Sequence, residues 1–267
     1  YYLTYTRLGK AEKGAENVFI TDAGDTDLPV NELVDGDLVE AAIDEAERMK
    51  KRAPKFVSKH AYSNVEEAIT AYTCGAIGLH APIRVRVEKE IDGVKQHKLI
   101  NATVGRLIFN EPIPQDLGFV DRGNPDNAFE LEVSFLVGKK KLGVIIDKCI
   151  RKHGFTVATE MLDRLKSLGY KYSTKGAITV SIADMAIPDK KYALIAEAEE
   201  EAVKIDKKYK RGFITNEERY RLVVKQWEQT IKDVTGALQE NLDRFNPIYM
   251  MADSGARGSM AQIRQLA

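Results

Sequence analysis

Apolar residues recur at alternating spacings of three and four in two stretches near the carboxyl end of the 267-residue chain. The first stretch carries Ile195, Ala198, Ala202, Ile205 and Tyr209, and the second carries Tyr220, Val224, Trp227, Ile231, Val234 and Leu238. Because residues three and four apart share one face of an α-helix, each stretch predicts an amphipathic helix of about 20 residues, roughly 30 Å long. Together the two patterns predict a long antiparallel helical hairpin that packs as a coiled coil.

The segment between these two helices carries residues that end one helix and begin another. Gly212 is placed to end the first helix, because glycine readily adopts the left-handed conformation found just beyond helix ends. Thr215 and Glu218 have the spacing of a capping box, in which two side chains satisfy free backbone amides at the start of a helix. The connection is therefore predicted to be tight.

Phe213 and Ile214 lie between these two signals, at the predicted tip of the hairpin. Such a tip has few neighbours that could cover large apolar side chains, so the pair indicates a docking site for another protein. The alternative is local packing on Tyr209 and Tyr220, and the residues alone leave both interpretations open. The predicted docking tip comprises Gly212, Phe213, Ile214, Thr215, Glu218 and Arg219.

The first two thirds of the chain mix strand and helix patterns. Alternation predicts strands at 83–91, 94–100 and 103–109, a hairpin turn at Asp92-Gly93, and a strand-like stretch at 170–182. Helical spacing predicts helices at 37–51, 66–72, 142–149 and 156–169, the last capped by Thr156. The predicted fold class is therefore α+β: an antiparallel β core with packed helices, followed by the helical hairpin. The predicted domains are residues 1–176 and 177–267.

An acidic region precedes the predicted strands, with ten acidic residues and no basic residue between positions 22 and 47. It contains no D-x-D-x-D-G loop of the kind that holds Ca²⁺, so a solvated surface insertion near 9–60 is favoured over a metal site. The histidines also lack metal-ligand spacing and are predicted to be packed side chains rather than ligands or catalytic bases. They are His60, His80, His97 and His153.

Composition excludes several classes of protein. Forty basic and forty acidic side chains cancel, so only a local patch would attract nucleic acid, and Arg84, Arg86 and Arg106 are the candidates for one. Cys74 and Cys149 form neither a C-x-x-C motif nor a disulfide framework, which favours a reducing, cytoplasmic location. No apolar run approaches the about 18 residues of a membrane-spanning helix.

A polar turn near the end of the chain contains Ser254, Gly255, Arg257 and Gly258. The two glycines permit backbone angles that other residues avoid, and the arginine between them could contact an anion. A tight structural turn is the alternative, and physical reasoning alone favours it. The capping signal at Ser259 predicts that a helix follows.

Six blocks of sequence carry a family signal. They are Tyr-Tyr-Leu-Thr (1–4), Gly-Leu-His-Ala-Pro-Ile-Arg-Val-Arg-Val (78–87), Thr-Val-Gly-Arg-Leu-Ile-Phe-Asn-Glu (103–111), Ile-Ala-Asp-Met-Ala-Ile-Pro (182–188), Gly-Phe-Ile-Thr-Asn-Glu-Glu-Arg-Tyr (212–220) and a final run that contains Met-Ala-Asp-Ser-Gly-Ala-Arg-Gly-Ser (251–259) and Gln-Ile-Arg-Gln-Leu-Ala (262–267). In this order they resemble the largest subunit, β′, of bacterial DNA-directed RNA polymerases.

The resemblance implies that residues 1–176 form the pore domain (largest-subunit domain 3) and residues 177–267 the funnel domain (domain 4), whose paired rim helices line the secondary channel. In that family nucleoside triphosphates enter and backtracked RNA leaves through this channel, and transcript-cleavage factors grip the rim helices. The implied partners are the β and α subunits, the rest of β′ and secondary-channel factors. DNA, RNA and nucleoside triphosphates are implied only for the assembled enzyme, and no membrane is.

The resemblance also implies nucleotidyl transfer by two Mg²⁺ ions, held in the family by an Asn-Ala-Asp-Phe-Asp-Gly-Asp motif. This sequence lacks the motif, so the chain alone is expected to be inactive, with no catalytic residue, metal ligand or cofactor of its own. Arg257 matches a family arginine near the incoming triphosphate, and Ser254, Gly255 and Gly258 share its turn. Because the chain starts at Tyr1 and stops inside a predicted helix, we expect an internal fragment. The second hypothesis is a stand-alone coiled-coil interaction module without a catalytic role.

Overall fold

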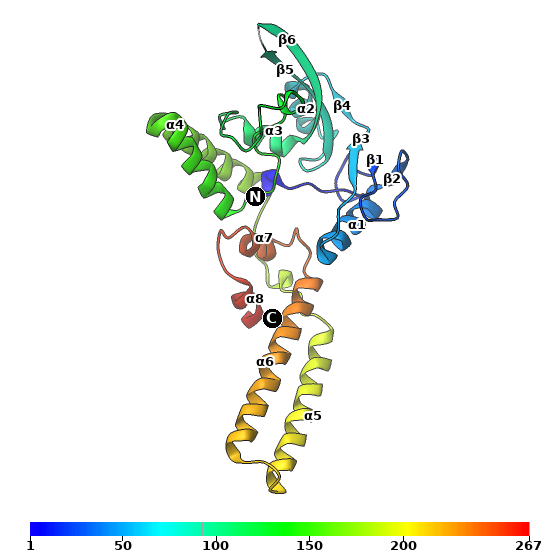
Figure 1. Cartoon of the computed structure of the whole chain (residues 1–267), viewed down its shortest axis with the longest axis vertical. Helices are drawn as coiled ribbons and strands as arrows, with labels where there is room; N and C mark the ends of the chain where they lie inside the picture. Colours follow the sequence, from blue (N-terminus) through cyan, green and yellow to red (C-terminus); the bar gives the residue numbers. More distant parts are fainter. Residues whose placement is uncertain (92, 267) are drawn as a thin grey trace. The chain divides into compact units, whose positions relative to one another are not determined.

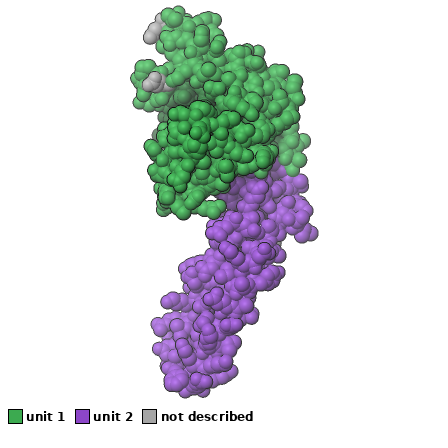
Figure 2. All heavy atoms as spheres, turned by 90° about the vertical axis from the view of Figure 1, so that its right-hand side faces the viewer, with its two compact units in different colours: residues 1–177 green, residues 178–267 purple. Residues whose placement is uncertain are grey.

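The computed structural model describes residues 1–91 and 93–266. It divides into two units, Tyr1–Ala177 and Ile178–Ala267, which are coloured green and purple in Figure 2. The helices and strands of each unit are labelled in Figure 1. Within the described residues, no helix combines the length and the apolar character needed to cross a membrane.

A small antiparallel sheet and one helix form the start of the first unit. Strands β1 (Asn17–Asp22), β2 (Leu33–Asp35) and β3 (Lys55–Ser58) pair in the order β2-β1-β3, and helix α1 (Gly36–Met49) follows β2. Their shared core consists of Leu8, Val18, Ile20, Val34 and Val39. The predicted helix at 37–51 is confirmed, and the acidic region is a folded element with its own core.

The second sheet holds the strands predicted at 83–91 and 94–100. Strands β4 (Ala61–Tyr62), β5 (Pro82–Ile91) and β6 (Val94–Thr103) pair in the order β4-β5-β6, parallel between β4 and β5 and antiparallel between β5 and β6. The turn predicted at Asp92-Gly93 lies partly outside the described residues, since Asp92 is not among them. Helix α2 (Val65–Thr73) confirms the prediction at 66–72.

The strand predicted at 103–109 is wrong, because this segment is helix α3 (Val104–Asn110). The side chain of Thr103 caps the helix by accepting a hydrogen bond from the backbone amide of Arg106 at 3.2 Å. Val104, Leu107, Ile108 and Phe109 are all buried. A segment that is buried on every side shows no periodicity that separates helix from strand. Here the cap at Thr103 is the local signal that favours a helix.

Helix α3 also removes the predicted patch of three arginines. Arg84 and Arg86 lie on strand β5, whereas Arg106 lies on α3 and its Nε donates to the backbone carbonyl of Thr4 at 3.2 Å. Burial lowers the pKa of Arg106. This guanidinium therefore joins two segments of the fold rather than extending a surface patch.

Helix α4 (Lys139–Lys175) covers the helices predicted at 142–149 and 156–169 and the start of the strand-like stretch predicted at 170–182. Gly154 has a φ of 79°, which breaks the helix into two pieces, so two helices were correctly expected here. Thr156 is not their boundary, because it lies after the break and inside the second piece. The strand-like stretch at 170–182 is wrong up to Lys175, since the helix continues and buries Tyr172.

The main core of the first unit lies among α2, α3, α4 and the second sheet. Its most buried members are Ala68, Val85, Val104, Val133, Ile145 and Cys149. Short 3-10 helices occur at η1 (Tyr2–Thr4) and η2 (Pro125–Asn127). The fold class is therefore α+β, as predicted, with one antiparallel and one mixed sheet.

The second unit consists of helices and contains the predicted hairpin. A 3-10 turn, η3 (Ile182–Asp184), leads into α5 (Lys190–Lys210), which lies beside α6 (Asn216–Asn241) in Figure 1. Ion pairs of 3.9 Å join the two helices near each end, Lys190 with Glu240 and Arg219 with Asp206, as an antiparallel arrangement requires. Helices α7 (Pro247–Asp253) and α8 (Met260–Leu266) follow, and a small core joins Leu238, Leu242 and Ile263.

The contact stripe predicted on α6 is wrong in part. Tyr220 is 70% exposed, and Val224 and Ile231 are 37% and 44% exposed. Thr230 is buried instead, and Val223 is half-buried. Both stripes have spacings of three and four, so the pattern alone could not show which one faces α5.

Candidate functional site

The tip of the hairpin begins with a defined helix end. The backbone amide of Gly212 donates to the carbonyl of Tyr209 at 2.8 Å, and that of Phe213 donates to the carbonyl of Lys208 at 3.1 Å. Gly212 has a φ of 78°, a conformation that costs glycine little. This pair of bonds is the Schellman motif, so the sequence prediction for Gly212 is confirmed as a helix-ending residue.

The second helix of the tip begins with a complete capping box. The hydroxyl of Thr215 accepts from the amide of Glu218 at 3.2 Å, and the carboxylate of Glu218 accepts from the amide of Thr215 at 3.1 Å. Glu218 also places negative charge in the first turn, where the helix dipole favours it. Two local motifs therefore hold Phe213 and Ile214 in a short, fixed connection.

The two apolar residues at the tip differ in exposure. Phe213 is 74% exposed, whereas Ile214 is half-buried. Arg219 turns back toward the hairpin, because its guanidinium bonds the side chain of Asn216 at 2.8 Å and lies 5.0 Å from the ring centre of Tyr209. The tip therefore presents one large aromatic side chain on a connection whose backbone is held by hydrogen bonds at both ends.

The turn after α7 holds the predicted nucleotide-side residues. Ser254 ends α7, and its hydroxyl accepts from the amide of Ala256 at 3.3 Å. Gly255 and Gly258 have φ angles of 74° and 81°, so both positions require the freedom of glycine. The amide of Arg257 donates to the carbonyl of Met251 at 3.2 Å. The four predicted residues therefore share one turn.

The side chain of Arg257 is exposed and forms no ion pair with the residues that the structure describes. The turn is fixed by backbone and serine contacts and not by the guanidinium. An arginine that is not used by its own fold is available to an anion, and its planar fork suits phosphate.

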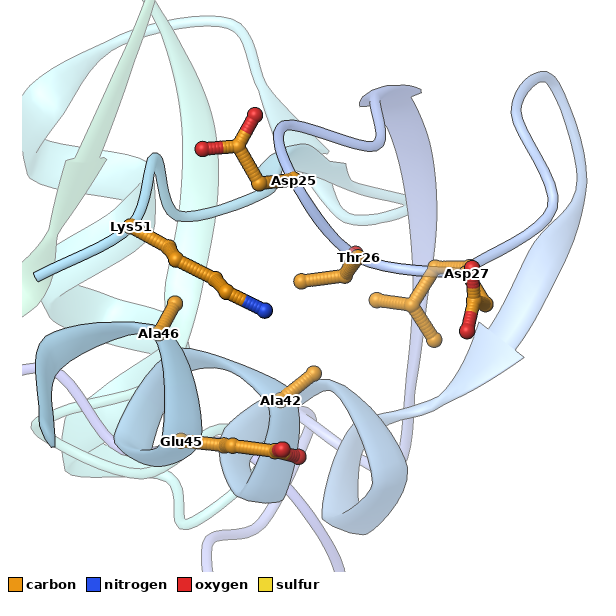
Figure 3. A pocket seen from close by; sticks show the side chains of 8 residues that line it. Asp25, Thr26, Asp27, Ala42, Glu45, Ala46 and Lys51 are labelled. Atoms are coloured by element: carbon orange, nitrogen blue, oxygen red, sulfur yellow. The ribbon is translucent and has the colours of Figure 1, made fainter. Parts of the chain in front are cut away.

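A hollow of about 300 Å³ lies between helix α1 and the loop that contains Thr26 (Figure 3). The amino group of Lys51 points into it, over the small side chains of Ala42 and Ala46. Asp25, Asp27 and Glu45 also line it, so its charges do not select one class of ligand. Sequence reasoning missed the hollow, because small helix residues facing a loop give no sequence signal.

Among the described residues, the histidines and acids form no further site, and His97 is exposed rather than packed as predicted. His80 is 3% exposed and packs edge-on against Tyr2, with ring centroids 4.6 Å apart. Burial lowers the pKa of His80 to about 4, so its imidazole is neutral at pH 7, and the prediction of a packed histidine is confirmed. In the described part of the chain, no group of three or more His, Cys, Asp or Glu residues is placed to hold a metal ion.

Comparisons with known proteins match most of the chain. The family model of RNA polymerase Rpb1 domain 3 matches residues 48–185, and that of Rpb1 domain 4 matches residues 201–267. The DNA-directed RNA polymerase subunits β′ of Clostridium novyi and Acetivibrio thermocellus are each 56% identical over 206 residues, and that of Clostridium acetobutylicum is 58% identical over 207.

These alignments cover 77% or 78% of the chain but only 17% or 18% of each relative. The chain thus spans less than a fifth of the length of the β′ subunits it matches. Residues 1–47 lie outside both family models, and they include β1, β2 and most of α1. The matched domains leave the identity in no doubt: the chain belongs to the Rpb1 family, the largest subunits of RNA polymerase, and corresponds to a region of the bacterial β′ subunit.

Proposed function

We propose that the chain forms part of the secondary-channel wall of a bacterial RNA polymerase, and that the tip of the α5–α6 hairpin docks transcript-cleavage factors and other coiled-coil regulators. The observation that carries the proposal is Phe213, an apolar ring 74% exposed on a connection fixed by a Schellman motif and a capping box. An exposed aromatic side chain on a fixed backbone loses little backbone freedom on binding, which favours a partner that buries it.

In this proposal residues 1–176 serve as the pore domain and residues 177–267 as the funnel domain. The β and α subunits and the remaining regions of β′ complete the enzyme around them, in the cytoplasm. Nucleoside triphosphates enter and backtracked RNA leaves along the wall. The alternative of a stand-alone coiled-coil module is not favoured, because the matches to both polymerase domains extend across most of the chain.

Catalysis in the whole enzyme is nucleotidyl transfer, for which Mg²⁺ supplies the charge stabilisation. The described residues do not fit an Mg²⁺ site, since they offer no cluster of three carboxylate or other ligating side chains. In this proposal the region contributes channel wall, factor docking and Arg257 beside the incoming triphosphate, and nucleotidyl transfer takes place in the assembled enzyme.

The docking proposal is tested by titrating the whole 267-residue chain with the transcript-cleavage factor of the same organism. We expect the parent chain to bind. The double variant Phe213→Ser, Ile214→Ser should weaken binding by about tenfold or more, because buried aromatic anchors contribute more than 1 kcal/mol each.

Tyr192→Ser is the matched control, because Tyr192 is 68% exposed on the same hairpin but lies in the first turn of α5, far from the tip. It should leave binding unchanged, and circular dichroism should show equal helix content in all three proteins. A parent chain that does not bind, or a control that weakens binding as much as the tip variant, contradicts the proposal.

A further inference from the structure

Asn246 lies at the start of helix α7, and its side chain contacts three backbone groups. Its Oδ1 accepts hydrogen bonds from the amides of Ile248 at 2.9 Å and Tyr249 at 3.4 Å, which caps the helix. Its Nδ2 donates to the backbone carbonyl of Asp184 at 2.7 Å, 62 residues earlier in the chain. The side chain therefore makes a local cap and also a bond to a distant segment.

These partners determine the orientation of the side-chain amide. An asparagine side chain has one acceptor oxygen and one donor NH2 group. The oxygen faces two amides and the nitrogen faces a carbonyl, so the opposite orientation would lose all three bonds. An aspartate at this position could cap the helix but could not donate to Asp184.

The segment that accepts the distant bond is itself fixed. Asp184 ends the 3-10 turn η3, and its carboxylate accepts from the amide of Ser181 at 2.6 Å as part of a capping box. The next residues, Met185 and Ala186, pack against the small core of the second unit. Asn246 therefore joins α7 to a segment that its own cap and the core already hold.

Helix α7 connects this bond to the turn that carries Arg257. The last carbonyls of the helix hold the turn, since Met251 accepts from the amide of Arg257 at 3.2 Å and Ala252 accepts from that of Gly255 at 3.1 Å. The helix has only seven residues, and a helix shorter than about 12 residues has little stability of its own. Its position therefore depends on the contacts that hold it, and Asn246 supplies one at its first turn.

We propose that Asn246 is a positioning residue: by tying α7 to Asp184, it sets where the turn of Arg257 lies and so aligns the guanidinium with the phosphates of the incoming triphosphate. This inference rests on the proposed role of Arg257. The side chain of Asn246 is occupied by backbone groups, so it acts through Arg257 and not on the nucleotide directly. Small displacements of a contacting group are costly, which is why such an anchor matters.

Asn246→Asp separates the cap from the distant bond, because a carboxylate keeps the acceptor and loses the donor. Asn246→Ser also keeps a capping oxygen, and it is the second variant in case the added charge disturbs folding. Asn64→Asp is the matched control. Asn64 caps α2 by accepting from the amide of Glu67 at 2.7 Å, and its side chain donates no hydrogen bond within the described residues.

The first measurement is amide hydrogen exchange in the whole 267-residue chain. Asn246→Asp and Asn246→Ser should speed exchange at the amides of Gly255 and Arg257 by about fivefold, the loss expected for one hydrogen bond. Asn64→Asp should leave both amides at the parent's rate, and circular dichroism should show equal helix content. Parent-like exchange in both Asn246 variants, or equally fast exchange in the control, overturns the proposal.

The second measurement is the kinetics of the assembled polymerase. Asn246→Asp should raise the KM for nucleoside triphosphates by about fivefold and leave kcat within about twofold, whereas a loss of folded enzyme would lower kcat at an unchanged KM. The double variant Asn246→Asp, Arg257→Ala should have the KM of Arg257→Ala alone, because a positioning residue has no effect once the residue that it positions is gone. Additive increases in KM would contradict this link.

Failure of this inference and failure of the proposed role of Arg257 give different results. If an Arg257→Ala enzyme keeps the parent's KM, the role proposed for Arg257 is wrong, and the exchange rates alone decide whether Asn246 positions the turn. If Arg257→Ala raises KM but exchange at the turn is unchanged in the Asn246 variants, Arg257 acts without Asn246 and the inference is wrong.

Discussion

At two glycines of the first unit, a neighbouring backbone oxygen lies so close that no side chain can be accommodated. A Cβ at Gly105 would lie 2.2 Å from the backbone oxygen of Leu3, and one at Gly36 would lie 2.3 Å from that of Ala15. Backbone atoms cannot turn aside as a long side chain can, so these positions exclude every other residue. Gly143 in α4 is the opposite case, because a Cβ there would meet nothing within 4 Å.

This difference gives a paired prediction at the residue scale. Gly105→Ala should lower the free energy of unfolding by about 2 kcal/mol or more, as overpacking of a close contact does. Gly143→Ala should raise it by about 0.5–1 kcal/mol, because alanine loses less backbone entropy in a helix. Urea unfolding followed by circular dichroism measures both, and equal midpoints for the two variants would contradict the proposed contact with Leu3.

At the scale of elements, local signals were more informative than periodicity. The capping box at Thr215 and the helix end at Gly212 were predicted correctly, because both depend on neighbours within a few residues. The strand predicted at 103–109 failed because tertiary burial hid the helical period. The stripe through Tyr220 failed because the choice between two apolar faces depends on the partner helix. Both outcomes depend on tertiary contacts, which the local sequence does not specify.

The capping box itself can be tested. Thr215→Ala removes the hydroxyl that accepts from the amide of Glu218, and should cost about 1 kcal/mol of hairpin stability. Thr235→Ala is the matched control inside α6, where the hydroxyl bonds only the carbonyl of Ile231. That change should be neutral or slightly stabilising, because alanine is the better helix former. Thermal unfolding followed by circular dichroism measures both variants. Equal unfolding temperatures for the two would show that the cap does not stabilise the hairpin.

Over the whole molecule, a neutral net charge conceals strongly charged parts. Acidic residues are concentrated between 22 and 47, and the segment from Arg164 to Lys175 holds four basic residues and no acidic one. The basic patch predicted from the sequence was instead that of Arg84, Arg86 and Arg106. In a strand, Lys171 and Lys175 would share a face, but Arg164 joins them on one flank only because helix α4 continues to Lys175.

The predicted role of Arg257 belongs to the assembled polymerase, since this chain spans less than a fifth of the related β′ subunits. If its guanidinium contacts the incoming triphosphate, Arg257→Ala in the whole enzyme should raise the KM for nucleoside triphosphates by about tenfold or more, the loss expected for a charged hydrogen bond. Arg257→Lys should restore part of the affinity, because it keeps the charge but not the fork.

The isolated chain should keep its unfolding temperature in both variants, since backbone and serine contacts hold the turn. Gly258→Ala is the structural contrast: with a φ of 81° it should destabilise the turn itself. An Arg257→Ala enzyme with the parent's KM, or an isolated variant that unfolds as early as Gly258→Ala, would instead make Arg257 a residue of the turn alone.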